Sequence, residues 1–483
     1  MRKLNITEAV FEKCYPGTTL KQSSAERRNI ILGKTPVKWR TARLHSSGTV
    51  LTVANDKVKR KELLYPNIRE LLKNKESVVV DDDKRDILQV FLDRNSLPEE
   101  CDVYKLDLQK GSPVENSEAD GEEPAAEEED ARAIRTFSWN VMESLEEGDR
   151  AVNVQHFTSS LLCSKYADVD VLHITAENIV NAVVTYVLDG LSAEKTLRNV
   201  LAILFHPNGT DYLRELFEYS RLPESRNQCL TYWERAVNSI KIAEHDELRM
   251  EEPANYGELS EEEIPGEQDE MEGYPAENRE QQVPFSMEYV LEHIRNVLGE
   301  WPERPEIIQA LSDGESPWKE FLERKESPKA LFILSGSQAV HIRSFLMNLI
   351  NMAVKKEAKD NPYSVNRLLM VWQLDRSVPD IQTIESFISN VDIRKSGISY
   401  LLSAYDMETV DDCSKTGNGI ERAADIVLIE PCQEYIDRMK AGQDKFSRKL
   451  AKKMERTILE PHAIVGKVVS KNKLFQLRKI WTE

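Results

Sequence analysis

The chain has 483 residues, which is enough for two or three domains with sizeable cores and excludes a small disulfide-stapled module. Hydrophobic residues make up 40% and charged residues 30% of the sequence, as in globular proteins that carry polar insertions. The six cysteines are scattered and form no CxxC pair, so we expect no disulfide framework and no cysteine metal site. The apolar runs are shorter than the ~20 residues that cross a bilayer, so we expect a cytoplasmic protein without a membrane span.

The net charge of −19 is concentrated in two acidic segments. Residues 115–130 hold nine acidic and no basic residues, and residues 244–280 hold fifteen acidic residues against two arginines. Segments so rich in charge and so poor in large apolar side chains cannot bury enough surface to offset the entropy of ordering. We therefore expect disordered acidic linkers at 109–134 and 246–284; a role in mimicking nucleic acid or docking a basic partner is the alternative.

Short β-branched runs alternate with helical periodicity after an N-terminal segment at 1–44. That alternation is typical of βαβ units and of a parallel sheet. We therefore assign residues 45–149 to the first half of an α/β core. The predicted strands and helices lie, in chain order, at 48–54, 58–74, 77–81, 84–95 and 102–108.

Residues 150–245 show helical spacing without strand signals, as in AENIVNAVVTYVLDGL, and predict an all-α insertion. The strand and helix alternation resumes after residue 328, so the second half of the core is assigned to 285–437. Both halves are expected to share one sheet. The later predicted strands lie at 329–335, 367–374, 396–404 and 425–431.

The turn after the first strand of such a sheet is where a phosphate-binding loop belongs, because backbone amides and a helix N-terminus converge on an anion there. A GxxxxGK[ST] cradle needs glycines for backbone conformations closed to larger residues, a lysine for the phosphates and a hydroxyl for magnesium. Only Lys59 is present; Val53 and Val58 stand at the glycine positions and Arg60 at the hydroxyl position. Because β-branched Val58 disfavours positive φ, we expect nucleotide binding to be weak or absent.

The residues around this turn resemble a known family. VANDKVKRKELLYPNI, followed by KESVVVDDDKRDIL, DVYKLDL and FSWNVME, is similar to the N-terminal half of the type IV coupling proteins, the TraG/TraD-type ATPases of bacterial conjugation and type IV secretion. Pro66 and Asn67 match the family's Pro-Asn pair. Asp82 and Lys84 match its Asp-x-Lys-Gly turn, with Arg85 in place of the glycine.

The resemblance spans roughly residues 45–430 and implies a RecA-like P-loop NTPase sheet with the inserted all-α domain. Its second half includes the family's acidic strand, whose Asp-Glu pair falls on Met370 and Val371. That pair holds magnesium and orients the attacking water in P-loop NTPases, so its replacement predicts loss of hydrolysis. Lys59 and Asp82 are left as weak, vestigial phosphate contacts.

The C-terminal segment 438–483 is basic, with thirteen lysines and arginines against three acidic residues between 438 and 479. It predicts an amphipathic helix with an apolar seam at Phe446, Leu450 and Met454. Its polar face is either simply solvated or contacts DNA, an acidic membrane surface or the acidic linkers. The side chains expected to contact DNA or a partner are Lys445, Arg448, Lys449, Lys452 and Lys453.

By this resemblance we expect a catalytically silent pseudo-ATPase that serves as a scaffold or adaptor in bacterial conjugative DNA transfer or type IV secretion. The expected partners are other conjugation or secretion proteins, including an active ATPase homologue or a relaxase, and DNA. No cofactor is expected, and the expected location is the cytoplasm, including the inner face of the membrane. Two alternatives are an ATPase completed in trans by a partner subunit, and a DNA-binding accessory protein that uses the basic C-terminus.

Overall fold

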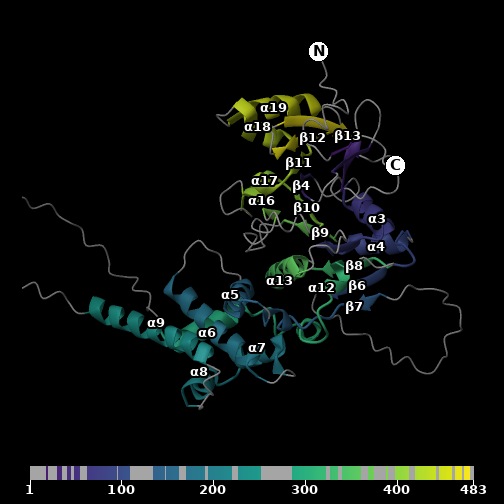
Figure 1. Cartoon of the computed structure of the whole chain (residues 1–483). Coiled ribbons are helices and arrows are strands. Elements are labelled where there is room, and N and C mark those ends of the chain that lie inside the picture. Colours follow the sequence, from purple (N-terminus) through teal and green to yellow (C-terminus); the bar gives the residue numbers. More distant parts are fainter. Residues whose placement is uncertain are drawn as a thin grey trace, which may run out of the picture. The chain divides into compact units, whose positions relative to one another are not determined.

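The computed structural model of the chain is shown in Figure 1. Contacts divide it into an α/β unit, formed by Met1–Gly148, Cys163–Lys165 and Glu300–Glu483, and a helical unit, formed by Asp149–Leu162 and Tyr166–Gly299. The residues that the structure describes are 18–19, 30–34, 41–44, 48–54, 63–94, 96–108, 134–146, 148–162, 170–190, 194–219, 227–251, 285–322, 327–335, 340–360, 368–374, 388–389, 397–412, 419–441, 445–458, 463–469 and 473–478.

The α/β unit is built on a 13-stranded sheet with the order β1-β3-β2-β13-β12-β11-β4-β10-β9-β5-β8-β6-β7. Neighbouring strands from β11 to β7 pair in parallel, and strands from the two halves of the chain are interleaved there. The predicted shared parallel sheet is thereby confirmed. Its strands are β4 (Thr49–Val53), β5 (Ser77–Asp81), β6 (Asp102–Asp107), β7 (Arg135–Thr136), β8 (Lys329–Leu334), β9 (Leu368–Gln373), β10 (Ile398–Ala404) and β11 (Ile426–Ile429).

Helices cover both faces of the parallel strands, so successive residues of each strand enter different cores. On one face Val80 of β5 and Val371 of β9 share a buried cluster with Ile68 of helix α3 (Tyr65–Lys73) and with α4 (Asp86–Asp93). From β10 the Tyr400 hydroxyl donates to Asn351 Oδ1 of α13 (Val340–Asp360) at 3.1 Å. Continuous apolar runs such as LLMVWQ therefore belong to strands that are buried on both sides.

Helix α12 (Trp318–Leu322) and the preceding helix α11 (Pro305–Ala310) lie near the β6 and β7 edge. Tyr104 of β6 contacts Phe137 and Phe321, and Phe137 contacts Trp318, which meets Trp139 edge to face at 5.2 Å. This aromatic cluster packs against β6, while both residues of the edge strand β7 are exposed.

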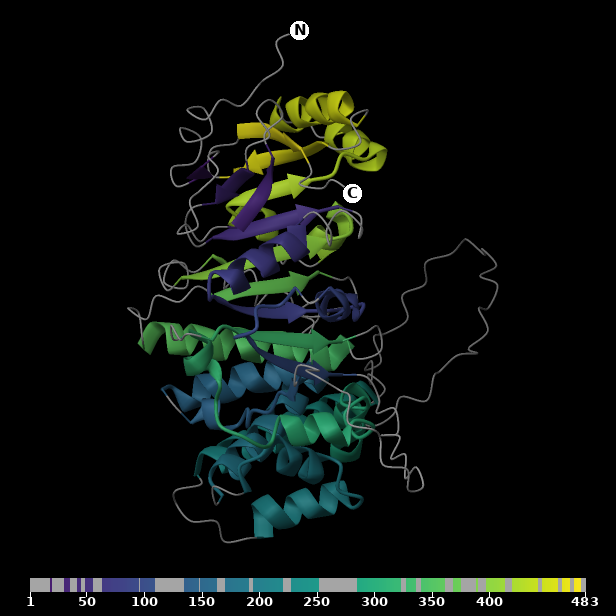
Figure 2. The same cartoon turned by 90° about the vertical axis from the view of Figure 1, so that its right-hand side faces the viewer.

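The sheet continues beyond β11 with antiparallel strands that the sequence reading missed. A hairpin of β12 (Ala463–Val468) and β13 (Lys473–Arg478) pairs with β11 on one side and with β2 (Ile30–Lys34) on the other, and β3 (Thr41–Leu44) and β1 (Thr18–Thr19) follow. Figure 2 shows the N-terminal purple strands beside the C-terminal yellow hairpin. The segments expected at 1–44 and 438–483 therefore both contribute to the core sheet.

The helical unit confirms the all-α pattern of the insertion, and each of four helices starts at a side-chain cap. Asp149, Asp170, Thr196 and Ser286 accept from backbone N–H groups at the starts of α5, α6, α7 and α10. The elements are α5 (Arg150–Leu161), α6 (Val171–Leu188), α7 (Leu197–Leu204), α8 (Gly209–Arg214), a π-helical turn (Glu215–Tyr219), α9 (Asn227–Glu251) and α10 (Met287–Val297).

The helical unit extends further along the chain than predicted, to Gly299 instead of residue 245. Helix α10 belongs to it because Arg295 donates to the Leu204 and His206 carbonyls at 3.0 and 2.6 Å, which ties α10 to the end of α7. The second half of the α/β core accordingly starts near residue 300, not at 285. The acidic segments at 109–133 and 252–284, expected to be linkers, lie outside the described residues.

Helix α6 is the one described helix that is long and apolar enough to cross a membrane, with 18 residues and a mean hydropathy of 1.4. Within the structure 61% of this stretch is buried, against α5, α7, α9 and α10 of its own unit. Such burial is what the core helix of a helical domain requires. Helix α6 therefore gives little support to a membrane span.

Candidate functional site

The carboxyl ends of β11, β4 and β10 form a topological switch point. From β4 the chain continues to β5, which lies three strands away in one direction along the sheet. From β10 it continues in the opposite direction, past β4, to β11. Ligands of open α/β sheets bind in the crevice outside such strand ends. Val53 ends β4 there and is 5% exposed. Val58, Lys59 and Arg60 lie outside the described residues, so the degenerate phosphate turn stays a prediction.

The structure places Met370 and Val371 in the middle of β9, opposite Val79 and Val80 of β5. Both side chains are fully buried and point to opposite faces of the sheet, so neither can face a ligand at the strand end. The two positions assigned to the family's acidic pair therefore lie short of the carboxyl edge of the sheet, three and two residues before Gln373, the last residue of β9. Gln373 and Leu374 occupy that edge instead, while residue 375 lies outside the described part of the chain.

Gln373 presents a neutral carboxamide at the end of β9, and its neighbours hold it in place. Its side-chain Oε1 accepts from the Ser403 hydroxyl of β10, and its backbone carbonyl accepts from Arg343 Nη2 at 2.6 Å. Its side chain is 4% exposed. A carboxamide is a weaker magnesium ligand than a carboxylate and cannot serve as a base.

The nearest described carboxylate, Asp81 at the end of β5, is fully buried and bound by protein groups. Arg343 of α13 donates through Nε to Oδ1 and Oδ2 at 3.1 and 3.2 Å, and its own side chain is only 3% exposed. Ser335 Oγ and the Gln373 backbone N–H donate to the two oxygens at 3.1 Å each. Asp81 is thus charge-neutralised within the protein and does not face a metal.

Asp81 and Arg343 were not singled out from the sequence, although an aspartate that ends the buried run SVVVD is a usable signal. Its partner is 262 positions away along the chain, so the pairing follows only from the sheet order. Among the described residues, no three His, Cys, Asp or Glu side chains are grouped so that they could hold a metal ion.

Asp82, expected from the resemblance to be a weak phosphate contact, holds the start of a helix. Its two carboxylate oxygens accept from the Ile87 and Leu88 backbone N–H groups, at 3.1 and 3.0 Å, at the start of α4. The side chain is fully buried and stabilises the helix N-terminus. Arg85, which replaces the family's glycine, adopts the left-handed φ of 59° that a glycine would favour, and its side chain pairs with Asp107.

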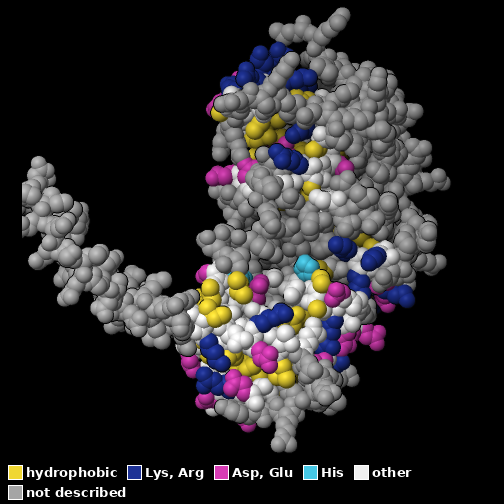
Figure 3. Space-filling view, turned by 60° about the vertical axis from the view of Figure 1, so that its left-hand side comes forward, with side chains coloured by type: hydrophobic (Ala, Val, Ile, Leu, Met, Phe, Trp, Pro, Cys, Tyr) yellow, Lys and Arg dark blue, Asp and Glu magenta, His cyan; other side chains and the backbone are white. Residues whose placement is uncertain are grey.

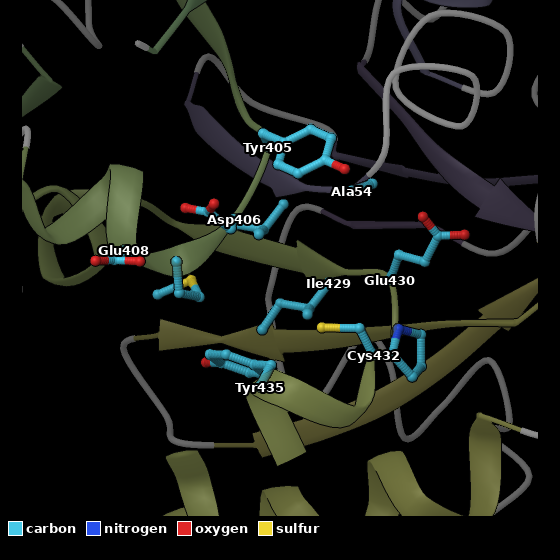
Figure 4. A pocket seen from close by; sticks show the side chains of 11 residues that line it. Ala54, Tyr405, Asp406, Glu408, Ile429, Glu430, Cys432 and Tyr435 are labelled. Carbon is cyan, nitrogen blue, oxygen red and sulfur yellow. The ribbon is translucent and has the colours of Figure 1, made fainter. Parts of the chain in front are cut away.

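A pocket of about 360 Å³ opens at the switch point, and of its lining residues only Val53 was singled out from the sequence. Figure 4 shows the side chains around it, which come from the ends of β4, β10 and β11 and from helices α16 (Met407–Asp412) and α18 (Gln433–Ala441). The described lining combines carboxylates with aromatic and apolar groups and includes no lysine or arginine. It consists of Val53, Ala54, Tyr405, Asp406, Met407, Glu408, Ile429, Glu430, Pro431, Cys432 and Tyr435.

The predicted basic helix is α19 (Lys445–Thr457), and its apolar seam is confirmed at Leu450 and Met454, which are buried. Arg448, Lys449 and Lys452 are exposed, and Figure 3 shows Lys and Arg side chains gathered at the end of the α/β unit that carries α18 and α19. We call these three side chains the α19 basic face. Lys453 is half-buried, and the side chains of Lys445 and Phe446 lie outside the described ones.

In the sheet, β10 and β9 lie between β4 and β5, and β11 lies on the other side of β4. This strand order, together with the inserted helical domain, defines a RecA-like P-loop NTPase fold. The bacterial conjugative coupling protein TrwBdeltaN70 has this fold. Its unbound monoclinic form matches with a TM-score of 0.56 and 11% identity, over 96% of this chain and 90% of that one. Its trigonal form, in complex with sulphate, matches with a TM-score of 0.51 and 11% identity, over 90% and 86%.

VirB4 of Thermoanaerobacter pseudethanolicus is a more distant match, with a TM-score of 0.42 and 10% identity, over 94% of this chain and 97% of that one. No protein-family model matches the chain, and no curated protein matches it in sequence. The coupling-protein fold that the resemblance implied is confirmed by the two TrwBdeltaN70 structures.

Proposed function

We propose that this protein is a catalytically silent relative of the coupling proteins, which acts as a scaffold or adaptor in bacterial conjugative DNA transfer or type IV secretion. The supporting observation is the end of β9, where hydrolytic relatives need carboxylates. Gln373 stands there as a neutral amide, and the neighbouring Asp81 is neutralised by Arg343. Among the described residues at this strand end, none presents a carboxylate that is not already held by protein groups, which supports loss of magnesium ligation and of water activation.

The adaptor role places the protein in the cytoplasm, at the inner face of the membrane during transfer, with an active ATPase homologue, a relaxase or other secretion proteins as partners. The fold is compatible with this role, because one fold can carry functions other than the chemistry of its catalytic relatives. Co-purification with a transfer apparatus from the same cells tests it; a chain that associates with no component of such an apparatus would remove the proposal.

Hydrolysis is tested on the purified full chain with magnesium and ATP. We expect no phosphate release above that of Lys59→Ala. The alternative of an ATPase completed in trans needs Lys59 and Asp82 as phosphate contacts, and the engagement of both Asp82 oxygens by α4 speaks against it. Calorimetry with ATP and magnesium separates the two: measurable binding that Asp82→Asn weakens would favour the trans-completed enzyme.

A second candidate function is DNA binding through the α19 basic face, because its three cations are exposed along one side of a helix whose other side is buried. Each phosphate contact contributes about −0.9 to the slope of log K against log salt for duplex DNA. Exchanging Arg448, Lys449 and Lys452 for Gln should therefore reduce the slope by about 3.

Fluorescence anisotropy with a labelled duplex measures that slope. The matched control is Lys440→Gln, which removes a cation that already pairs with Glu455 at 2.6 Å. An unchanged slope in the triple variant would dismiss this face as the DNA contact.

A further inference from the structure

The pocket at the carboxyl ends of β4, β10 and β11 has a lining that the adaptor proposal leaves without a role. Asp406 and Glu408 follow β10, and Glu430 follows β11, with β4 between them. The two strands that these residues follow are thus two strand spacings apart, about 9–10 Å. Among the described lining residues, a phosphate group would meet carboxylates on both sides of this pocket, which disfavours an anionic ligand.

Two tyrosines complete the polar lining. Tyr405 is 64% exposed and offers an open ring face. Tyr435 is 5% exposed, and within the described part of the chain no hydrogen bond reaches its hydroxyl. In Figure 4 its ring lies beside Ile429 with the hydroxyl on the side of Glu408. A buried hydroxyl that opens on a pocket without a protein partner is expected to meet a ligand group.

Burial raises the pKa of the Tyr435 hydroxyl above its ordinary value, and the Glu421 carboxylate adds to that rise. The hydroxyl therefore stays neutral and can accept a hydrogen bond from a cationic N–H group. Asp406 is fixed in place because its Oδ1 accepts from the Thr409 backbone N–H at 2.7 Å, at the start of α16. The acidic side of the pocket is thus already ordered before any ligand arrives.

We propose that this pocket receives the guanidinium group of an arginine side chain presented by a partner polypeptide. A guanidinium is a planar cation with N–H donors on several edges, so it can reach carboxylates on both sides with charge-assisted bonds of about 2.8 Å. Its face can lie against the Tyr405 ring. The inference goes beyond the adaptor proposal and does not rest on catalytic silence.

The exposed thiol of Cys432 lines the pocket and allows a direct test on the full chain. The protein is equilibrated in a thiol buffer with the disulfide of 2-mercaptoethylguanidine or of its neutral isostere N-(2-mercaptoethyl)urea. Mass spectrometry of the Cys432 peptide then gives the fraction of mixed disulfide with each probe. We expect the guanidinium probe to be preferred about tenfold at low salt, as the product of about threefold from each acidic side.

Three variants test which residues cause the preference for the guanidinium probe. The double variant Asp406→Asn, Glu430→Gln should bring the ratio close to one; it should fold, because asparagine caps a helix as well as aspartate. Tyr435→Phe should lower the ratio about threefold through the lost hydrogen bond. The control Asp437→Asn removes one charge from the same helix as Tyr435, outside the pocket lining, and should keep the tenfold preference.

Three results would overturn the inference: equal capture of the two probes by the unmodified chain, a tenfold preference that survives in the double variant, or protection of Cys432 from both probes by magnesium and ATP. The last result would make the pocket a nucleotide site. ATP hydrolysis is measured separately, so failure of this test is distinguishable from failure of the proposed catalytic silence.

Discussion

Removal of Arg343 should destabilise the centre of the sheet more than any change of a surface charge. Arg343→Met leaves the Asp81 carboxylate buried with its charge uncompensated, since Asp81 is 0% and the arginine side chain 3% exposed. Breaking one side of a buried ion pair costs about 3–5 kcal/mol. Methionine keeps most of the apolar volume of the arginine stem, so the loss reports the charge and not a cavity.

Hydrogen exchange followed by mass spectrometry resolves this effect by element. Peptides that contain β5 and β9 should lose about 10²–10⁴-fold in protection, because each 1.4 kcal/mol is tenfold. Peptides from α6 in the helical unit serve as the internal control and should change little. The double variant Asp81→Asn, Arg343→Met removes both charges and should recover most of the protection. A loss below tenfold in Arg343→Met would refute the reasoning that Arg343 neutralises Asp81.

Two smaller effects follow from local geometry. Lys75 is exposed just after α3 with a φ of 61°, so Lys75→Gly should stabilise by about 0.5–1 kcal/mol relative to Lys75→Ala in urea unfolding; equal stabilities would contradict the left-handed assignment. A hydrogen bond to Glu177 raises the pKa of His173. The contribution of this bond to the free energy of unfolding is therefore present below pH 6.5 and is lost as pH rises through the raised pKa. In thermal melts of the full chain, His173→Gln should remove that loss of stability above pH 6.5. Burial lowers the pKa of His293, which gives the opposite trend, a loss of stability at acid pH.

The parallel sheet was predictable because its strands are buried on both faces and read as continuous β-branched and apolar runs, as in SVVVD and KALFIL. The helical insertion was equally clear from its spacing. The hairpin of β12 and β13 was missed because its lysines resembled a solvated basic tail and because its partner β2 lies more than 400 positions away in sequence. Contacts that distant leave no local pattern.

The sequence indicated that the candidate site lies at the carboxyl ends of the parallel strands, but not which residues stand there. Alignment on flanking residues placed the acidic pair on Met370 and Val371, whereas β9 ends at Gln373. Because the five residues of β9 before Gln373 are all apolar, a shift of two or three residues changes little of the hydrophobic pattern, and only the sheet register with β5 and β10 reveals it. The role of Asp82 as a helix cap likewise depends on where α4 begins, which propensity places only approximately.

The measurement that tests the central claim most directly is the rate of ATP hydrolysis by the purified full chain with magnesium. With Gln373 at the end of β9 and Asp81 held by Arg343, we predict a rate equal to that of Lys59→Ala and no dependence on magnesium. Magnesium-dependent hydrolysis that Lys59→Ala abolishes would contradict the account.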